Sequence, residues 1–188
     1  MAQIRLLVGL GNPGRKYAKT RHNLGYMVLD YMAQKENRKF MPGKGEWKQT
    51  RLLQGQTEIW AIKPKTFMNL SGFAVKAFCD YYKIEPDQVL VVCDDINLPV
   101  GKLRIREFGS AGGHKGLEDI IAAFNSDRFA RLRLGIGMPP ESQPSEIYVL
   151  QQFDDNEHKI IGELIENAAS AVCRIISEGI VAAQNVYN

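Results

Sequence analysis

The chain of 188 residues is 45% hydrophobic and 24% charged, a composition typical of one globular domain that buries a full core. No apolar run is long enough to cross a membrane, and no signal-peptide pattern precedes the first strand, so we expect a cytoplasmic protein. Three scattered cysteines, Cys79, Cys93 and Cys173, form no C-x-x-C motif, which indicates reduced thiols.

Positive charge is concentrated toward the start of the sequence, although the net charge is only +3. Residues 1–65 hold 13 Lys and Arg against 4 Asp and Glu, residues 99–140 hold 7 against 4, and residues 141–188 hold 2 against 8. This asymmetry favours a polyanionic partner for the two basic segments. Ordinary solvated charge is an equal alternative unless the cations share one face.

The first third of the chain predicts a strand, a helix and a β-hairpin. Apolar residues over Ile4–Leu10 indicate a buried strand, and helical spacing over Asn23–Gln34 indicates an amphipathic helix. A basic stretch, Lys35–Gly45, connects this helix to two further strands. These strands, Trp47–Leu53 and Glu58–Lys63, flank a short glycine-containing turn, which is typical of a hairpin.

The turn between the first strand and helix carries the pattern G-x-G-x-x-G at Gly9, Gly11 and Gly14, which is also the dinucleotide-binding fingerprint. In that fingerprint a helix opens at the third glycine and places the pyrophosphate at its N-terminus. Here Gly14 precedes a basic stretch, and helical spacing begins only at Leu24. We therefore interpret the turn as a different ligand-binding loop. A nicotinamide enzyme is the alternative, and it predicts a retained, reducible cofactor.

The middle of the chain predicts two helices and two strands. Helical spacing runs from Ser71 to Tyr82, and either Asn69 or Ser71 is suited to cap that helix. Val89–Cys93 is a buried strand that leads into two acids, and Leu103–Arg106 is a short basic strand. The glycines of residues 109–116 open the next helix and make its N-terminus suitable for an anion, although a plain tight turn is the commoner use.

Toward the C-terminus, residues 131–137 alternate Arg and Leu, which predicts a strand with one cationic and one apolar face. A last short strand is expected over Ile147–Leu150. The clearest helix covers Asn156–Glu178, and Gly179 is expected to end it. Strands alternating with helices predict one domain over residues 1–188, a layered α/β/α globule with a mixed, mostly buried β-sheet covered by helices.

Polar side chains that can carry chemistry lie at the ends of different elements: Asn12, His22, Asn69, Asp94, His114 and Lys115. Such ends can converge at one edge of an α/β sheet. A histidine oriented by a carboxylate can activate water, and amides can hold a carbonyl oxygen or its oxyanion. No serine or cysteine lies beside an obvious base, which favours activation of water over a covalent nucleophile. The three histidines show no ligand spacing, so we expect no metal site, and we expect no cofactor.

The plainer interpretations of these residues stay open at this point. His22 also suits a solvated loop, His114 suits a helix end, and Asn69 is more readily explained as a helix cap.

Five sequence blocks follow one another between Gly9 and about Leu150: GLGNPG with Tyr17 and TRHN, KTFMNLSG at 65–72, DDINLP-x-G at 94–101, GGH-x-GL at 112–117 and RLR-x-GIG at 131–137. In this order they resemble the motifs of bacterial peptidyl-tRNA hydrolase. The resemblance implies a monomeric, metal-free esterase that binds no DNA and no membrane. Such an enzyme cleaves the ester between a peptide, or an N-blocked amino acid, and the 3′-terminal ribose of tRNA, and so recycles tRNA.

The resemblance also implies roles for individual residues. His22 is the general base, Asp94 rather than Asp95 orients it, and Asn12 helps to discriminate N-blocked from free aminoacyl groups. The residues implied to contact the substrate are Tyr17, Phe67, Asn69, His114 and Lys115. Those implied to lie near the tRNA 5′-phosphate are Arg104, Arg106 and Arg133, which give salt-dependent affinity without reading sequence.

One departure from the family concerns Lys115, which stands where the family usually has an asparagine that contacts the substrate. A lysine donates but does not accept hydrogen bonds, so it cannot keep a two-way amide contact, although it can attract a 3′-terminal phosphate. The alternative function is therefore a non-catalytic RNA-binding scaffold, as in organellar splicing relatives of this fold. That alternative predicts an exposed apolar patch covered by a protein partner.

Overall fold

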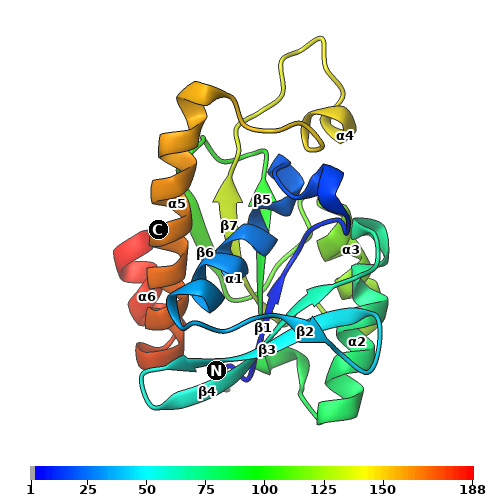
Figure 1. The fold of residues 1–188 in the computed structure, drawn as a ribbon, viewed down its shortest axis with the longest axis vertical. Coiled ribbons are helices and arrows are strands. Elements are labelled where there is room, and N and C mark those ends of the chain that lie inside the picture. Colours follow the sequence, from blue (N-terminus) through cyan, green and yellow to red (C-terminus); the bar gives the residue numbers. More distant parts are fainter. Residues whose placement is uncertain (1–2) are drawn as a thin grey trace.

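The computed structural model describes residues 3–188, in which one seven-stranded sheet carries helices on both faces (Figure 1). The strand order is β2-β3-β4-β1-β5-β7-β6. The strands are β1 Leu6–Gly9, β2 Met41–Pro42, β3 Trp47–Gln54, β4 Thr57–Pro64, β5 Val89–Asp95, β6 Leu103–Arg106 and β7 Ala130–Gly135. The helices are α1 Leu24–Lys35, α2 Ser71–Tyr82, α3 Lys115–Phe124, α4 Ser145–Tyr148, α5 Asp155–Glu178 and α6 Ile180–Tyr187. Short 3₁₀ turns are η1 Arg15–Tyr17, η2 Arg21–Asn23, η3 Met68–Leu70 and η4 Pro86–Gln88.

The sheet is mixed, as the sequence predicts. The strands β4, β1, β5 and β7 run parallel, whereas β3 pairs antiparallel with β4 and β6 pairs antiparallel with β7. The hairpin and the α/β class are therefore confirmed. No helix within residues 3–188 is long and apolar enough to span a lipid bilayer.

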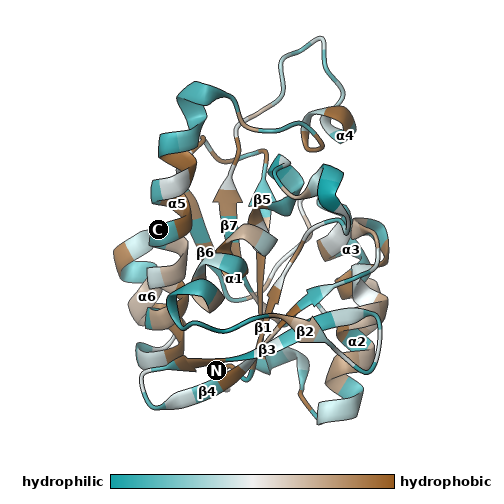
Figure 2. Cartoon of the chain, in the orientation of Figure 1, coloured by the Kyte–Doolittle hydropathy of each residue, from teal (hydrophilic) through white to brown (hydrophobic). Residues whose placement is uncertain are grey.

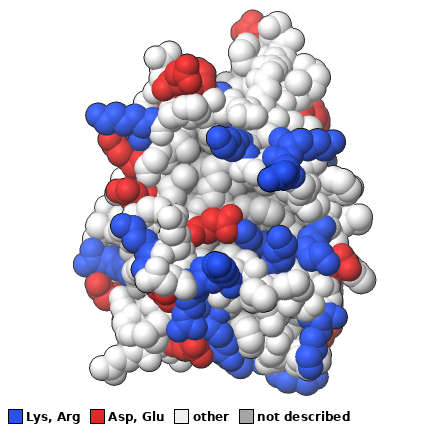
Figure 3. Space-filling model, viewed as in Figure 1, with Lys and Arg blue, Asp and Glu red and all other residues white. Residues whose placement is uncertain are grey.

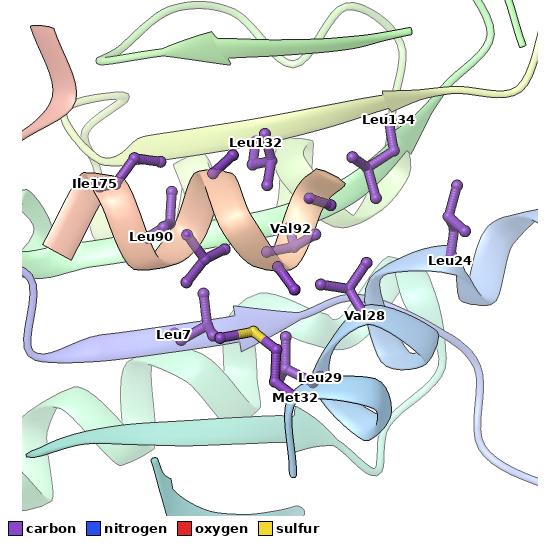
Figure 4. Close-up of a cluster of buried hydrophobic side chains, with 14 of the residues drawn as sticks. Leu7, Leu24, Val28, Leu29, Met32, Leu90, Val92, Leu132, Leu134 and Ile175 are labelled. Atoms are coloured by element: carbon purple, nitrogen blue, oxygen red, sulfur yellow. The ribbon is translucent and has the colours of Figure 1, made fainter. Parts of the chain in front are cut away.

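Alternate side chains of the central strands face two separate hydrophobic clusters. Leu7, Leu90 and Val92 belong to the cluster that packs against α1 and α5 (Figure 4). Leu6 and Val91 face the opposite side, where α2 and α3 cover the sheet. Because both faces are buried, these parallel strands are apolar at nearly every position, which appears as brown along the sheet in Figure 2.

Two expectations about local structure are wrong, and one further helix was not predicted. Ile147–Leu150 belongs to α4 and the turn after it instead of a strand, because no sheet edge lies alongside it and Tyr148 anchors the turn by donating to the Ile136 carbonyl. Neither Asn69 nor Ser71 caps α2, because η3 runs directly into this helix. Gly179 ends α5 as predicted, with a φ of 90°, and the helix that was not predicted, α6, follows immediately.

Gln184 of α6 and the residue that follows this helix, Asn188, cover the free edge of strand β6. The side-chain amide of Asn188 accepts from the backbone N–H of Ile105 at 2.7 Å and donates to its carbonyl at 3.1 Å. Gln184 donates to the same carbonyl at 3.2 Å. These bonds satisfy backbone groups that would otherwise be exposed at the free edge.

A glycine in the first turn of α1 lets this helix lie directly on the sheet. A Cβ at Gly25 would lie 2.6 Å from the backbone nitrogen of Leu10 and closer still to the Val92 carbonyl oxygen. We expect Gly25→Ala to destabilise the protein by about 1–3 kcal/mol, because backbone atoms cannot move aside as a flexible side chain can. Thermal unfolding measures this loss.

The matched control is Gly162→Ala, in the exposed middle of α5, where a Cβ meets no atom within 4 Å. This substitution should stabilise the protein by about 0.5–1 kcal/mol, because alanine loses less conformational entropy in a helix than glycine. A fall in the melting temperature of both variants to the same extent would contradict the packing argument for Gly25.

Candidate active site

A cleft of about 390 Å³ is lined by residues at the carboxyl ends of β1 and β5, in α4 and at the start of α3. Figure 1 shows where these elements lie. Residues from distant parts of the sequence line it: Asn12, Tyr17, His22, Phe67, Asn69, Asp94, His114, Lys115 and Arg133. Two other predicted residues, Arg104 and Arg106, lie outside this lining on β6. The ends of parallel strands thus bring most of the candidate residues to one site.

The centre of the cleft is a carboxylate held between two imidazoles. Asp94 is the penultimate residue of β5 and is only 2% exposed. The Nδ1 of His22, in η2, lies 2.9 Å from each Asp94 oxygen. The Nε2 of His114 lies 3.1 Å from Oδ1 of the same carboxylate. The two imidazole rings are 4.9 Å apart between centroids.

The contacts of His114 determine its tautomer. Its Nδ1 accepts from the backbone N–H groups of Gly116 and Leu117, at 3.2 and 3.3 Å, and so caps α3. A nitrogen that accepts carries no proton, so the ring proton is assigned to Nε2, which donates to Asp94. His114 is thus the helix-end residue of the plainer interpretation, and it also orients the central carboxylate.

The contact with Asp94 likewise determines the tautomer of His22. Because Nδ1–H donates to the carboxylate, the basic lone pair of His22 lies on Nε2. Burial lowers the pKa of His22, but the charge and hydrogen bonds of Asp94 raise it by more, so it lies above the usual value. Burial raises the pKa of Asp94, but contact with both histidines brings it well below its usual range. The carboxylate therefore stabilises the protonated form of His22.

His22, Asp94 and His114 could also bind a metal ion, because one ligand atom of each lies within 4.8 Å of the others. The expectation of no metal site rests on the wide spacing of the histidines along the chain. The fold nevertheless brings His22 and His114 together with Asp94. The hydrogen bonds favour a different use of these groups. Both imidazoles use an N–H to bind Asp94, and the second nitrogen of His114 already accepts from the backbone of α3.

Asn12 presents one end of its amide to the cleft. Its Oδ1 accepts from the backbone N–H of Met68 at 2.8 Å, so its Nδ2 is the end available for a ligand. Asn23 holds the backbone of Asn12 with two bonds, donating to its carbonyl at 2.9 Å and accepting from its N–H at 2.8 Å. Asn23 is not among the predicted site residues, although its place directly after His22 is a usable signal.

Three further predicted residues form the mouth of the cleft. Phe67 is 53% exposed and meets the ring of Tyr17 edge to face, with centroids 6.4 Å apart. Asn69 lies two residues further on, in η3, with its side chain exposed. Because Asn69 caps no helix, its amide is available at the cleft.

Lys115 begins α3 at the edge of the cleft. Its ammonium group lies 3.1 Å from the carboxylate of Glu118, one turn later in the same helix. Gly113, with a φ of 84°, makes the turn that brings His114 inward and leaves Lys115 exposed. The lysine is therefore part of the cleft wall and already has an acidic neighbour.

The arginines of β6 and β7 share one face of the sheet. Arg104 lies opposite Arg133 in the strand register, and Arg106 lies opposite Arg131. Residues directly opposite each other in an antiparallel pair point to the same side. Arg104 and Arg106 are exposed and have no ion-pair partner within residues 3–188. Elsewhere, Lys and Arg occur in groups interspersed with acids on the face drawn in Figure 3, which is not one continuous basic patch.

The two arginines of β7 differ in what they contact. Arg133 is 22% exposed and its Nε lies 2.8 Å from Asp95, whose other oxygen accepts from the backbone of Asn97. Arg131 is 1% exposed and donates to backbone carbonyls, including those of Gly109 and Asp127. The cationic face predicted for this strand is therefore only partly accessible, because Arg131 supports the loop before α3.

Comparison with known proteins points to one family. A family model described as peptidyl-tRNA hydrolase matches residues 6–188. A peptidyl-tRNA hydrolase from Chloroflexus aurantiacus is 45% identical over 187 residues, covering 97% of this chain and 98% of the relative. One from Desulfitobacterium hafniense is 40% identical over 185 residues, covering 98% and 100%. A crystal structure of peptidyl-tRNA hydrolase from Acinetobacter baumannii superposes with a TM-score of 0.93 at 33% identity, covering 100% of this chain and 97% of that one.

Proposed function

Since the chain belongs to the peptidyl-tRNA hydrolase family and hydrolyses peptidyl-tRNA, we propose that it does so with a water molecule activated by His22 and without a metal ion. The observation that carries this proposal is the bond from Nδ1 of His22 to the buried carboxylate of Asp94, at 2.9 Å. It leaves Nε2 as the base at the cleft.

The reaction begins when Nε2 of His22 takes a proton from water and the hydroxide attacks the ester carbonyl carbon. Asp94 stabilises the imidazolium that forms, and His114 keeps Asp94 oriented. The amides of Asn12 and Asn69 donate to carbonyl oxygens of the substrate. The imidazolium then gives its proton to the 3′ oxygen of ribose as the C–O bond breaks, which releases the peptide and tRNA.

The cleft contacts suggest how the substrate is selected. The exposed rings of Phe67 and Tyr17 offer stacking surfaces for the 3′-terminal adenine. The Nδ2 group of Asn12 can bind the carbonyl attached to the blocked amino nitrogen of a peptide or N-blocked amino acid, and a free aminoacyl group lacks this second carbonyl. Lys115 can bind a phosphate of the 3′ end when its contact with Glu118 opens.

Arg104, Arg106 and Arg133 are proposed to bind the 5′-phosphate end of the acceptor stem. We expect Arg133→Ala to raise KM and to reduce the slope of log affinity against log salt by about one, because one phosphate contact is lost. Measuring tRNA binding at several salt concentrations tests this expectation. Arg174→Ala, on α5, is the control, and an unchanged slope for Arg133→Ala would remove Arg133 from the phosphate site.

We further propose that the chain acts in the cytoplasm as a single-domain monomer whose partner is peptidyl-tRNA, without DNA or membrane binding. The hydrogen bonds around Asp94 support a metal-free reaction, because the N–H groups of both histidines are used there.

The test of the proposed function is release of acetyl-amino acid from acetyl-aminoacyl-tRNA by the wild-type protein, with and without a chelator. Release that resists the chelator supports the metal-free esterase. Release abolished by the chelator and restored by an added divalent ion would overturn it. A folded protein that binds tRNA but releases nothing would favour the RNA-binding scaffold.

A further inference from the structure

Arg21, the residue before His22, is buried and forms an ion pair with Glu157. Its guanidinium donates two parallel bonds to Glu157 at the start of α5, at 2.8 and 2.7 Å. Only 6% of Arg21 is exposed. Bidentate pairs of this kind fix orientation as well as charge. Burying an ion pair also costs desolvation free energy. A gain in stability alone therefore does not explain why this ion pair is buried beside the proposed base.

Two aromatic rings complete the contacts of this guanidinium. Its central carbon lies 4.5 Å from the ring centroid of Tyr148 and 4.8 Å from that of Phe153. The Tyr148 hydroxyl donates to the Ile136 carbonyl at 2.6 Å, just beyond β7. Glu157 also accepts from the backbone N–H of Asp154 in the capping box of α5. Arg21 therefore joins η2 to α4, to α5 and, through Tyr148, to the sheet.

The backbone around Arg21 connects the same parts. The N–H of Arg21 donates to the Gln151 carbonyl at 2.9 Å, and the N–H of His22 donates to the Val149 carbonyl at 2.8 Å. Val149 and Leu150 line the cleft. The backbone of the base and one wall of the site are thus bonded to each other, and the Arg21 side chain holds both against α5.

We propose that Arg21 is a positioning residue, whose contacts with Glu157, Tyr148 and Phe153 hold His22 in place against Asp94 and fix the Val149–Leu150 wall of the cleft. This inference rests on the proposed function, because it gives Arg21 its role through His22. Arg21 touches no reacting atom. Its loss acts by displacing the base, and a displacement of about 1 Å can cost on the order of 100-fold in rate.

The experiment compares kcat and KM for acetyl-aminoacyl-tRNA in Arg21→Lys and Glu157→Gln, at a temperature well below each unfolding transition. Lysine keeps the charge and loses the two-pronged contact. Glutamine keeps a side chain suited to the capping box and loses the carboxylate that Arg21 binds. Val172→Ala, a buried residue further along α5, is the control for a general loss of stability.

We expect kcat to fall about 10-fold or more in both Arg21→Lys and Glu157→Gln, with little change in KM, because the arginines of β6 and β7 are untouched. The Nδ1–H resonance of His22 in the proton NMR spectrum should weaken in these variants and persist in Val172→Ala. If Arg21→Lys does not fold, Glu157→Gln decides alone. A kcat for Glu157→Gln no lower than that of Val172→Ala overturns the inference.

Failure of this inference and failure of the proposed function give different results. An inactive His22→Ala beside fully active Glu157→Gln and Arg21→Lys variants rejects only the role of Arg21. An active His22→Ala rejects the proposed base, and the role of Arg21 falls with it.

Discussion

Replacing His22 by alanine is expected to lower kcat by about 10²–10⁴-fold, the usual contribution of a general base, while tRNA binding is unchanged. The physical reason is that the neighbouring imidazole cannot take over as the base. His114 lies next to His22, but its Nδ1 caps α3 and its Nε2–H binds Asp94. Steady-state hydrolysis of acetyl-aminoacyl-tRNA measures kcat, and equilibrium binding of deacylated tRNA measures affinity.

The control for this substitution is His158→Ala, because His158 is an exposed histidine near the start of α5 and does not line the cleft. Its variant should keep the activity of the wild type. Nearly normal turnover by His22→Ala would exclude His22 as the base and direct attention to a metal-bound or otherwise activated water.

Replacing Asp94 by asparagine is expected to lower kcat by a factor on the order of 10²–10⁴, since the neutral amide cannot orient the base. Asp94 accepts N–H groups from both His22 and His114. Asparagine has one accepting oxygen, and its NH₂ group opposes an N–H donor on one of the rings. His22 then either moves away or changes tautomer, and in the second case its Nε2 carries the proton and cannot accept one from water.

The pH dependence adds a second readout for Asp94→Asn. The carboxylate raises the pKa of His22, so its removal lowers that pKa. The acid limb of kcat/KM, which rises as His22 loses its proton, should therefore move to lower pH. Asp95→Asn is the matched control, because Asp95 faces Arg133 and should affect KM more than kcat. A larger loss of kcat for Asp95→Asn than for Asp94→Asn would reverse the assignment.

Several elements of the fold follow directly from the sequence, for a simple physical reason. The apolar runs of β1 and β5 can be satisfied only by burial on both faces, and α5 carries one continuous apolar stripe. Short apolar runs are less decisive. Ile147–Leu150 has the composition of a strand, but it forms helix and turn, because strand formation also needs a neighbouring edge.

The sequence also identifies the chemical groups of the site, since Asn12, His22, Asp94 and His114 stand at the ends of elements that a parallel sheet brings together. Apart from the family resemblance, which implies Asp94 as the orienting acid, the sequence does not show which way each side chain points. Asp94 and Asp95 are adjacent, and the pleat of β5 sends one toward the histidines and the other toward Arg133.

Tertiary structure alone decides the pairings that give these groups their roles. It buries Arg131 among backbone carbonyls while leaving Arg133 at the cleft, although both lie on the same face of β7. It brings Arg21 to Glu157, 136 residues away, and makes His114 both a helix cap and a support for Asp94. Composition and spacing report local preferences, whereas hydrogen bonds between distant segments depend on where the whole fold places their partners.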